Sequence, residues 1–264
     1  MTLKKELKDF YNSNRDYYLE ARRLNVNLTD EREKAFRFIP AGSLVLDIGC
    51  GTAENGKFIS EFARYVGLDF STIALDMALD YKLKNFYLVK GDVSRPCFKP
   101  GSFDVVISTY SLEHFLAPRD VLDQMYNVCK KGGCLIIISP AWDLPFQFPP
   151  SMNFAGNIYR RFFYIILRIF EDLRECFFGM KYNFKIIRNP SFMTNGYSQD
   201  NDTVYLTKAR EVITYLKHKG CKIMHASAER GAAGNIIFRM VKYLFIKIPK
   251  YKFGDSRFFV ILLT

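Results

Sequence analysis

One stretch constrains the fold of this chain more than any other, an apolar run that ends in a glycine-rich turn within residues 44–56. The run Leu44–Ile48 is short and contains β-branched residues, as buried parallel strands do. Gly49 and Gly51 then allow backbone angles that side chains forbid, so the chain can turn tightly and approach a ligand. A helix is expected from about Thr52, with its free N–H groups directed at the loop. The stretch therefore predicts a strand, a ligand-binding loop and a helix.

A dinucleotide-binding turn is the first alternative, since that motif has glycine at the first, third and sixth places of G-x-G-x-x-G. The sixth place here is Glu54. A pyrophosphate at this helix N-terminus would meet a carboxylate where it needs a positive potential, which disfavours a dinucleotide. An acidic loop suits a ligand with a cationic centre instead.

The loop resembles motif I of the class I S-adenosylmethionine-dependent methyltransferases, whose pattern is close to V/L-L-D/E-I/V/L-G-C/S-G-T/S-A/G. The match runs without a break from Val45 to Ala53. The resemblance implies that S-adenosylmethionine is the cofactor. It also implies that Asp47, Gly49, Cys50 and Gly51 belong to the cofactor-binding loop.

Two further acidic residues follow at positions that this family uses. The segment 62–71 is typical of a second strand, and its Asp69 lies about twenty residues beyond the loop, where a βαβ unit presents an acceptor to a ribose. By resemblance, Asp69 accepts both ribose hydroxyls and Phe70 lies near the adenine. The family pattern after the third strand likewise implies that Asp92 accepts from the adenine amino group and that the Val93 N–H meets the ring. For Asp69 alone, an ordinary turn residue at a strand end is the alternative.

The fourth and fifth predicted strands complete the first half of the sheet. Residues 102–108 carry the family's F-D-x-V signature, and Ser108 at their end is assigned to the cofactor by resemblance. A helix is expected over residues 118–129, and the basic residues and glycines at 130–133 are interpreted as its C-terminal cap. The strand 134–140 follows.

Beyond residue 140 the family outline predicts the remaining elements. A helix over residues 207–219 is indicated by apolar residues at helical spacing, and strands are expected at 221–228 and 256–264. In the family the last two strands form an antiparallel pair. The resemblance thus implies an α/β, Rossmann-like sheet of seven mostly parallel strands in the order 3-2-1-4-5-7-6, with helices on both faces.

Composition and length favour one methyltransferase domain over residues 1–264, because 49% hydrophobic residues supply a large core and no linker divides the chain. Within it we expect a helical cover at residues 1–38, a cofactor-binding core at 40–140 and substrate-lid insertions at 141–202 and 230–255. Six cysteines without C-x-x-C spacing and a charged N-terminus indicate a reduced, cytoplasmic compartment. In the cover, the candidates to lie near the carboxylate of the cofactor are Tyr17, Tyr18 and Arg22.

The net charge of +11 is distributed unevenly. Residues 1–150 contain nineteen Lys or Arg and nineteen Asp or Glu, whereas residues 151–264 contain nineteen against eight. The part assigned to the acceptor is therefore the basic part. Such asymmetry indicates an anionic partner: nucleic acid, a phosphorylated small molecule or a lipid surface.

Two stretches of the lid combine a wide apolar side with basic residues, at 159–170 and 236–250. Both are shorter than the roughly twenty mostly apolar residues that cross a bilayer. Both resemble interfacial helices, so contact with an anionic membrane surface at its inner face is our interpretation, and ordinary lid helices packed on the core are the alternative. Nucleic acid is the second choice of partner, because the Asn/Asp-Pro-Pro-Tyr motif of amino-methylating enzymes is missing after the fourth strand.

Methyl transfer to a hydroxyl requires an aligned acceptor and a group that removes its proton. His114, just beyond the fourth strand, is the candidate general base, with a cofactor-lining role as the alternative. Tyr110 is assigned to the acceptor, and it also replaces the first glutamate of the E-x-x-E-H arrangement of quinone-biosynthetic O-methyltransferases, so no metal is expected. Trp142 and Asp143 are candidate acceptor contacts because strand ends meet the ligand crevice, although packing explains Trp142 equally well.

These features predict O-methylation of a membrane-presented or anionic acceptor, such as a lipid-linked glycan intermediate. Three alternatives stay open: a soluble small-molecule acceptor, RNA, and a catalytically silent module that only binds the cofactor.

Overall fold

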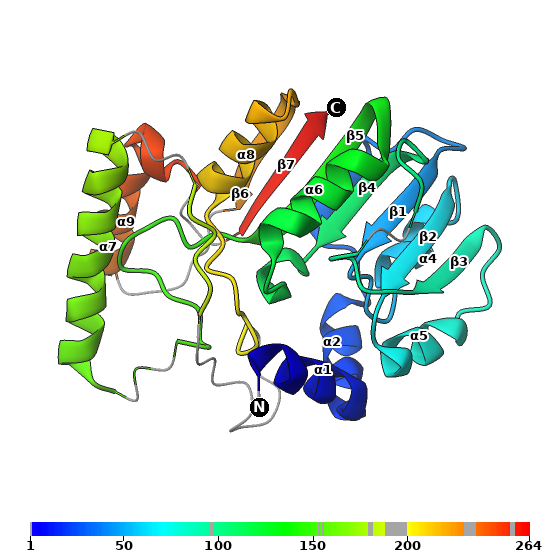
Figure 1. Cartoon of the computed structure of the whole chain (residues 1–264), viewed down its shortest axis with the longest axis horizontal. Helices are drawn as coiled ribbons and strands as arrows, with labels where there is room; N and C mark the ends of the chain where they lie inside the picture. The colour runs from blue at the N-terminus through cyan, green and yellow to red at the C-terminus, as the bar shows by residue number, and fades with distance from the viewer. Residues whose placement is uncertain are drawn as a thin grey trace.

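The computed structural model of the chain describes residues 2–95, 98–152, 154, 156–178, 182–187, 200–229, 236–253 and 257–264. A seven-stranded sheet with the order β3-β2-β1-β4-β5-β7-β6 lies at the centre (Figure 1). The first five strands pair in parallel, and β7 runs antiparallel to both β5 and β6. The predicted fold class and strand order are confirmed. The strands are β1 (Leu44–Ile48), β2 (Arg64–Asp69), β3 (Phe86–Lys90), β4 (Phe103–Thr109), β5 (Cys129–Pro140), β6 (Lys222–Glu229) and β7 (Arg257–Leu263).

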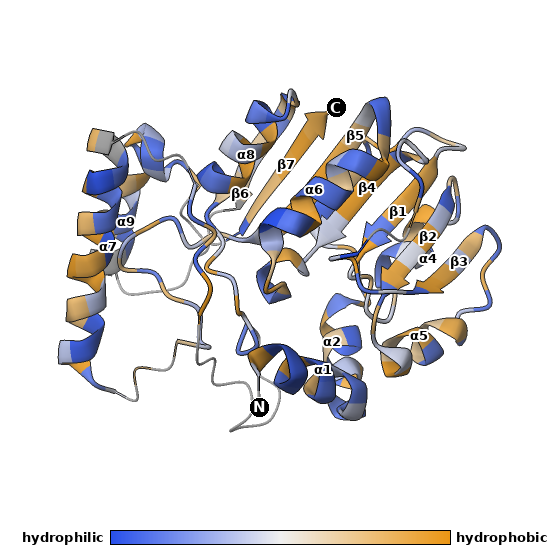
Figure 2. Ribbon diagram, viewed as in Figure 1, coloured by the Kyte–Doolittle hydropathy of each residue, from blue (hydrophilic) through white to orange (hydrophobic). Residues whose placement is uncertain are grey.

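Both faces of the central strands are apolar because helices cover both faces, and Figure 2 shows these strands as largely hydrophobic. Neighbouring residues of one strand therefore belong to different core clusters. Val45 and Ile136 pack on one face, and Leu46 and Ile137 pack on the other. This alternation is what a strand with a period of two requires when both of its sides are buried.

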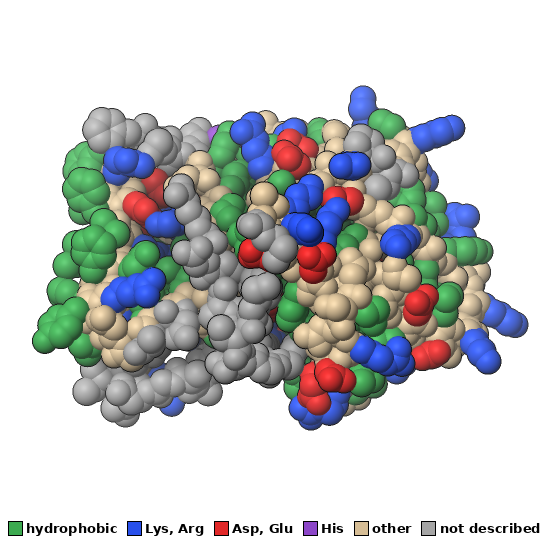
Figure 3. Space-filling view, turned by 60° about the horizontal axis from the view of Figure 1, so that its bottom comes forward, with side chains coloured by type: hydrophobic (Ala, Val, Ile, Leu, Met, Phe, Trp, Pro, Cys, Tyr) green, Lys and Arg blue, Asp and Glu red, His purple; other side chains and the backbone are tan. Residues whose placement is uncertain are grey.

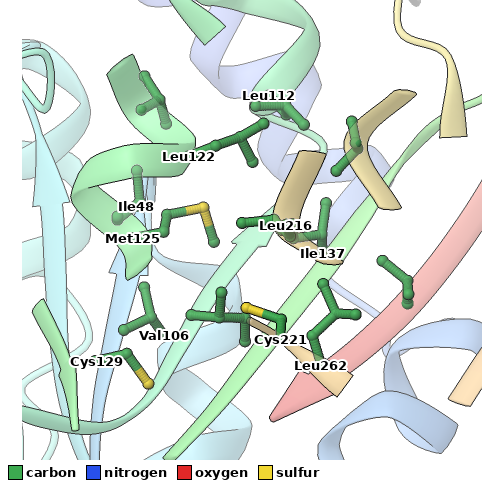
Figure 4. Packing of buried hydrophobic residues seen from close by; sticks show 14 of the residues in the cluster. Ile48, Val106, Leu112, Leu122, Met125, Cys129, Ile137, Leu216, Cys221 and Leu262 are labelled. Atoms are coloured by element: carbon green, nitrogen blue, oxygen red, sulfur yellow. The ribbon is translucent and has the colours of Figure 1, made fainter. Parts of the chain in front are cut away.

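Helices α6 (Pro118–Val128) and α8 (Ala209–His218) cover one face of the sheet. Leu122 and Met125 of α6 and Leu216 of α8 meet Ile137 of β5 in this cluster (Figure 4). Helices α3 (Asp30–Phe36), α4 (Glu54–Ile59) and α5 (Thr72–Leu79) supply residues to the cluster on the other face. The remaining helical elements are α1 (Leu3–Ser13), α2 (Arg15–Asn25), the 3₁₀ turn η1 (Leu112–His114), α7 (Ile158–Phe178), α9 (Ile236–Ile246) and η2 (Pro249–Tyr251).

Two local predictions need correction. The helix expected from about Thr52 begins at Glu54, because Ala53 takes a left-handed conformation with φ of 59° and closes the loop. The basic and glycine residues 130–133 do not cap the preceding helix. That helix ends at Val128, and the residues belong to β5, where the Gly132 N–H donates a hydrogen bond of 2.9 Å to the carbonyl oxygen of Thr264.

Two groups of helices lie outside the sheet and its covering layers. Helices α1 and α2 lie at the carboxyl ends of the parallel strands, and α7 and α9 lie at the opposite side of the molecule from β3 (Figure 1). The predicted lid insertions contain α7 and α9, while residues 188–199 and 230–235 of those insertions are outside the described part. Within the described residues, no helix combines the length and apolar character that crossing a bilayer needs.

Candidate functional site

A cavity of about 460 Å³ opens at the carboxyl ends of β1, β2 and β4, under α1 and α2. Its volume lies in the range of roughly 300–1,000 Å³ that small-molecule sites occupy. The position matches the rule that open parallel sheets bind ligands beyond their strand ends. The residues predicted from the sequence that line it are Gly49, Cys50, Gly51, Asp69, Phe70, Asp92, Val93, Tyr110 and His114.

The glycine loop leaves no room for a side chain at Gly49. Gly49 has φ of +69°, and a Cβ atom there would lie 2.7 Å from the Cβ of Ser111. The Gly51 N–H donates to Asp69 Oδ2 at 2.9 Å, and the Ser71 N–H donates to Asp69 Oδ1 at the same distance. Burial raises the pKa of Asp69, and these two backbone donors partly offset the rise. The loop thus fixes the orientation of this carboxylate at the end of β2.

Asp92 marks another end of the cavity, beyond β3. Its Oδ1 accepts from the backbone N–H and the hydroxyl of Ser94, and its Oδ2 lies 3.3 Å from Lys8 Nζ and 3.8 Å from Lys4 Nζ. Burial opposes ionisation of Asp92, but Ser94 and Lys8 outweigh it, so its pKa lies below the usual value. The site therefore presents an ionised acceptor at this end, and the lysines of α1 reach across to it.

Asp47 and Ser108 do not line the cavity, in contrast to the other predicted cofactor residues. Asp47 is completely buried behind the loop, where its Oδ2 accepts from Tyr65 Oη at 2.8 Å and from Asn55 Nδ2 at 3.0 Å. Burial raises its pKa to about 7. Ser108 Oγ lies 2.8 Å from Ser111 Oγ. Both residues therefore position the wall of the cavity from behind.

Trp142 and Asp143 also lie away from the cavity, which corrects their assignment to the acceptor. Asp143 is completely buried and accepts from the backbone N–H groups of Ala209 at 2.7 Å and Arg210 at 3.3 Å. It therefore satisfies the free N–H groups at the start of α8. Burial raises its pKa to about 6, against the effect of these donors. Trp142 donates its backbone N–H to the carbonyl oxygen of Thr207 at 2.8 Å.

His114 lies in a cluster whose other members the sequence analysis did not assign to catalysis. Its Nδ1 is 3.3 Å from Asp202 Oδ2, and the same oxygen accepts from Tyr11 Oη and Tyr17 Oη, each at 2.7 Å. Asp202 is buried and precedes α8, whereas the tyrosines come from the N-terminal helices. All four residues line the cavity. The N-terminal helices, the sheet edge and the segment before α8 thus meet at one carboxylate.

The electrostatic surroundings favour the protonated form of His114. Burial alone would lower its pKa, but the negative charges of Asp202 and Glu113 outweigh burial and raise it above the usual value. Glu113 is itself buried, which raises its pKa to about 7, and its Oε2 accepts from Ser139 Oγ at 2.9 Å. The imidazole is therefore able to hold a proton that it receives in the cavity.

Arg32 is a further cavity residue that the sequence analysis missed. It is only 1% exposed, its Nη1 donates to Asn55 Oδ1 at 3.3 Å, and its Nε has no hydrogen-bond partner among the described residues. Arg22, which was predicted near the carboxylate of the cofactor, does not line the cavity and donates instead to Tyr81 Oη at 2.9 Å. The predicted Tyr17 and Tyr18 do line it. The buried guanidinium of Arg32 therefore offers a donor for an anionic group in the cavity.

Tyr110 has a positive φ of 52° and donates its hydroxyl hydrogen to Glu31 of α3. The guanidinium of Arg257 lies over its ring at 5.1 Å and pairs with Glu31 at 3.2 Å. Tyr110 is thus held at the cavity wall by residues from distant parts of the chain. Among the described residues, no group of three or more His, Cys, Asp or Glu is arranged to hold a metal ion.

Comparison with known proteins gives this cavity its context. The family described as "Methyltransferase domain" matches residues 46–137, which contain the glycine loop, Asp69, Asp92 and His114. A solved S-adenosylmethionine-dependent methyltransferase from Mesorhizobium loti shares the fold with a TM-score of 0.60, over 90% of this chain and 100% of that one, at 15% identity. Residues 46–137 thus match a methyltransferase-domain family, and the fold is that of class I S-adenosylmethionine-dependent methyltransferases. Both matches favour the predicted cofactor, S-adenosylmethionine.

Two curated relatives show how varied the acceptors of similar proteins are. The chain is 27% identical to demethylmenaquinone methyltransferase of Staphylococcus haemolyticus over 57% of its own length and 66% of the relative. It is 38% identical to the 18S rRNA (guanine-N(7))-methyltransferase of Mus musculus over 39% of each chain. Both alignments span less than two thirds of the relative's length.

Proposed function

We propose that this methyltransferase methylates a hydroxyl group and that His114 is the base that accepts the hydroxyl proton. The observation that carries the proposal is the contact of His114 with Asp202 inside the cavity of the glycine loop. An imidazole oriented by a carboxylate is a common arrangement for proton removal.

The lining of the cavity fits S-adenosylmethionine. Asp69 is the proposed acceptor for the ribose hydroxyls, and Asp92 is the proposed acceptor for the adenine amino group, with Phe70 and Val93 beside the ring. The unpartnered Nε of Arg32 suits the carboxylate of the methionine part. When bound, this cofactor supplies a methyl group on a positively charged sulfur, which is already a good electrophile.

The proton path follows from the contacts of His114. With Nδ1 directed at Asp202, the neutral ring keeps its Nε2 lone pair for the acceptor hydroxyl. The acceptor oxygen would receive the methyl group of the bound cofactor, which leaves as S-adenosylhomocysteine, and Nε2 of His114 would take the proton that the acceptor oxygen loses. The imidazolium that results is stabilised by the charges of Asp202 and Glu113. The tyrosines that donate to Asp202 hold it in place.

The acceptor is, in this proposal, a membrane-presented or anionic molecule such as a lipid-linked glycan intermediate, and the enzyme acts at the cytoplasmic face of the membrane. Support comes from the excess of nineteen basic over eight acidic residues in the part beyond residue 150. RNA is the second candidate acceptor, because one relative is named for a guanine of 18S rRNA. A soluble small molecule is the third.

Transfer of labelled methyl groups into separated lipid, small-molecule and RNA fractions of a cell extract tests the proposal. We expect label in the lipid fraction with the wild-type enzyme, a strong reduction with His114→Asn, and none with Gly49→Arg, which blocks the loop. Label in RNA or in soluble molecules would overturn the proposed acceptor. Undiminished transfer by His114→Asn would overturn the proposed base, and no transfer into any fraction would favour a module that only binds the cofactor.

A further inference from the structure

Helix α7 buries two of its charged residues and exposes a broad row of apolar residues. Arg168 and Asp172 are 2% and 4% exposed, whereas Phe162 and Phe170 are 62% and 66% exposed. Figure 3 shows hydrophobic side chains gathered along the left edge of the molecule, over this helix. A helix at the surface of a water-soluble protein normally has the opposite orientation.

Buried polar contacts hold α7 in this orientation. Asp172 Oδ2 accepts from Tyr251 Oη at 2.7 Å, and Asp172 Oδ1 accepts from Arg210 Nη2 at 3.0 Å. Lys250 Nζ lies 3.6 Å from the same carboxylate. Arg168 donates to the backbone carbonyl oxygens of Trp142 and Gln147. Rotation of the helix would remove the carboxylate of Asp172 from Arg210, Tyr251 and Lys250, which are largely buried, so these contacts favour the outward apolar side.

Helix α9 repeats the arrangement. Lys242 is 6% exposed, and burial lowers its pKa, whereas Met240 and Leu244 are 63% and 62% exposed. The outer faces of the two helices are defined here by Phe162, Phe163, Ile166, Phe170, Met240 and Leu244, all of them exposed. Large apolar side chains that are exposed together in this way usually mark a docking site.

The exposed charges of these helices have one sign. Arg160, Arg161 and Arg174 of α7 and Arg239 of α9 are exposed. The three acidic residues of α7 are buried or half-buried, and α9 contains no acidic residue. Exposed cations beside an apolar face fit a partner whose outer layer is negative and whose interior is apolar. A second copy of the chain fits less well, because a two-fold interface would bring the arginines of both copies together.

We propose that the outer faces of α7 and α9 dock onto the anionic surface of a lipid bilayer. The apolar residues enter the boundary between headgroups and acyl chains, and the arginines meet the lipid phosphates. Docking would bring the enzyme to a membrane-held acceptor, so its purpose rests on the proposed function. Binding itself does not depend on methyl transfer.

Sedimentation with phosphatidylcholine vesicles that contain rising fractions of phosphatidylglycerol tests the docking surface. Binding should strengthen with the anionic lipid and weaken with salt. Arg160→Glu with Arg161→Glu should weaken it by roughly fivefold or more for each arginine. Phe162→Ser with Phe170→Ser should abolish most of it. The matched controls lie around α5 and β3, namely Lys82→Glu with Lys84→Glu and Leu79→Ser with Tyr87→Ser, and their side chains are similarly exposed.

Calorimetric binding of S-adenosylhomocysteine and thermal unfolding show that each variant is folded, independently of activity. Vesicle binding that ignores anionic lipid and salt, or that the control variants weaken equally, would overturn the proposal. A dimer that the phenylalanine variants dissociate, without vesicle binding by the wild type, would assign the faces to a second copy. Vesicle binding without any methyl transfer would retain the docking surface and reject the proposed function.

Discussion

The predicted cofactor-binding half and the predicted lid of this protein distribute polar and apolar residues in opposite ways. In the first half, Val45 and Leu46 of one strand are both buried, because helices cover both faces of the sheet. In the lid, α7 buries Arg168 and Asp172 and exposes Phe162 and Phe170. The comparison shows that the central sheet is stabilised by an apolar core to which both halves of the chain contribute. Helix α7 is held by buried ion pairs and leaves apolar side chains exposed.

The largest effect on folding stability is expected at Asp172, and it tests how α7 is held. Replacement of Asp172 by Asn removes the charge that Arg210, Lys208 and Lys250 face, which should cost about 3 kcal/mol of folding stability. Thermal unfolding measures the loss. Glu33→Gln in the exposed pair with Arg37 is the control, with an expected loss below about 1 kcal/mol. Equal stability of the Asp172→Asn variant and the wild type would show that the lid is not held by these ion pairs.

In the first half, the largest effect is expected at the loop. Gly49→Ala combines a strained positive φ with a Cβ atom 2.7 Å from Ser111, so binding of S-adenosylhomocysteine should weaken by about 100-fold. Gly101→Ala is the matched control, since Gly101 has φ of +62° but no atom within 4 Å of the added Cβ. Calorimetry of both variants separates the effect of the steric clash at Gly49 on ligand binding from the effect of backbone strain. Equal affinity for the ligand in the two variants would contradict the close approach at Gly49.

A smaller effect is expected at Arg32, where the N-terminal cover meets the cavity. Arg32→Met keeps much of the side-chain volume but removes the donors, so binding of S-adenosylhomocysteine should weaken by roughly 10- to 100-fold. Arg22→Met serves as the control, because Arg22 does not line the cavity. If Arg22→Met weakens binding more than Arg32→Met, the assignment of the carboxylate contact is wrong.

The smallest expected effect is a shift in the pH profile caused by Asp202. The neutral form of His114 accepts the proton, so the rate should rise with pH through its raised pKa. Asp202→Asn removes a charge that raises this pKa, and the acidic limb of the kcat/KM profile should move to lower pH. Tyr17→Phe, which keeps the carboxylate, should move the limb much less. An unshifted limb in Asp202→Asn would remove His114 from the proton path.

The sequence predicted the first half well because its signals are local. The strand, the glycine loop and Asp69 lie within one short βαβ unit, so the spacing alone fixes their geometry. The lid depends on contacts between distant residues. His114 and Asp202 are separated by 88 positions, and Asp143 caps a helix that begins 66 positions later. Neither contact can be predicted from the spacing of residues in the sequence.

The orientation of α7 illustrates the same limit. Its apolar and charged sides were recognised from the sequence, because a helical period displays them. The helical period does not determine which side of α7 faces the core. That choice depends on Tyr251 and Arg210, which come from other elements and supply partners for Asp172. Lys242, one of the basic residues of the stretch 236–250, is likewise buried.

Calorimetric titration with S-adenosylhomocysteine tests the central claim most directly, that the loop and Asp69 form a preformed cofactor site. The wild-type protein should bind with one site per chain. Asp69→Asn should weaken binding by roughly 10- to 100-fold, since a charged acceptor for two hydroxyl groups is lost. Asp76→Asn, at an exposed position of α5, should bind as the wild type does. No binding by folded wild-type protein, or unchanged binding by Asp69→Asn, would contradict the account.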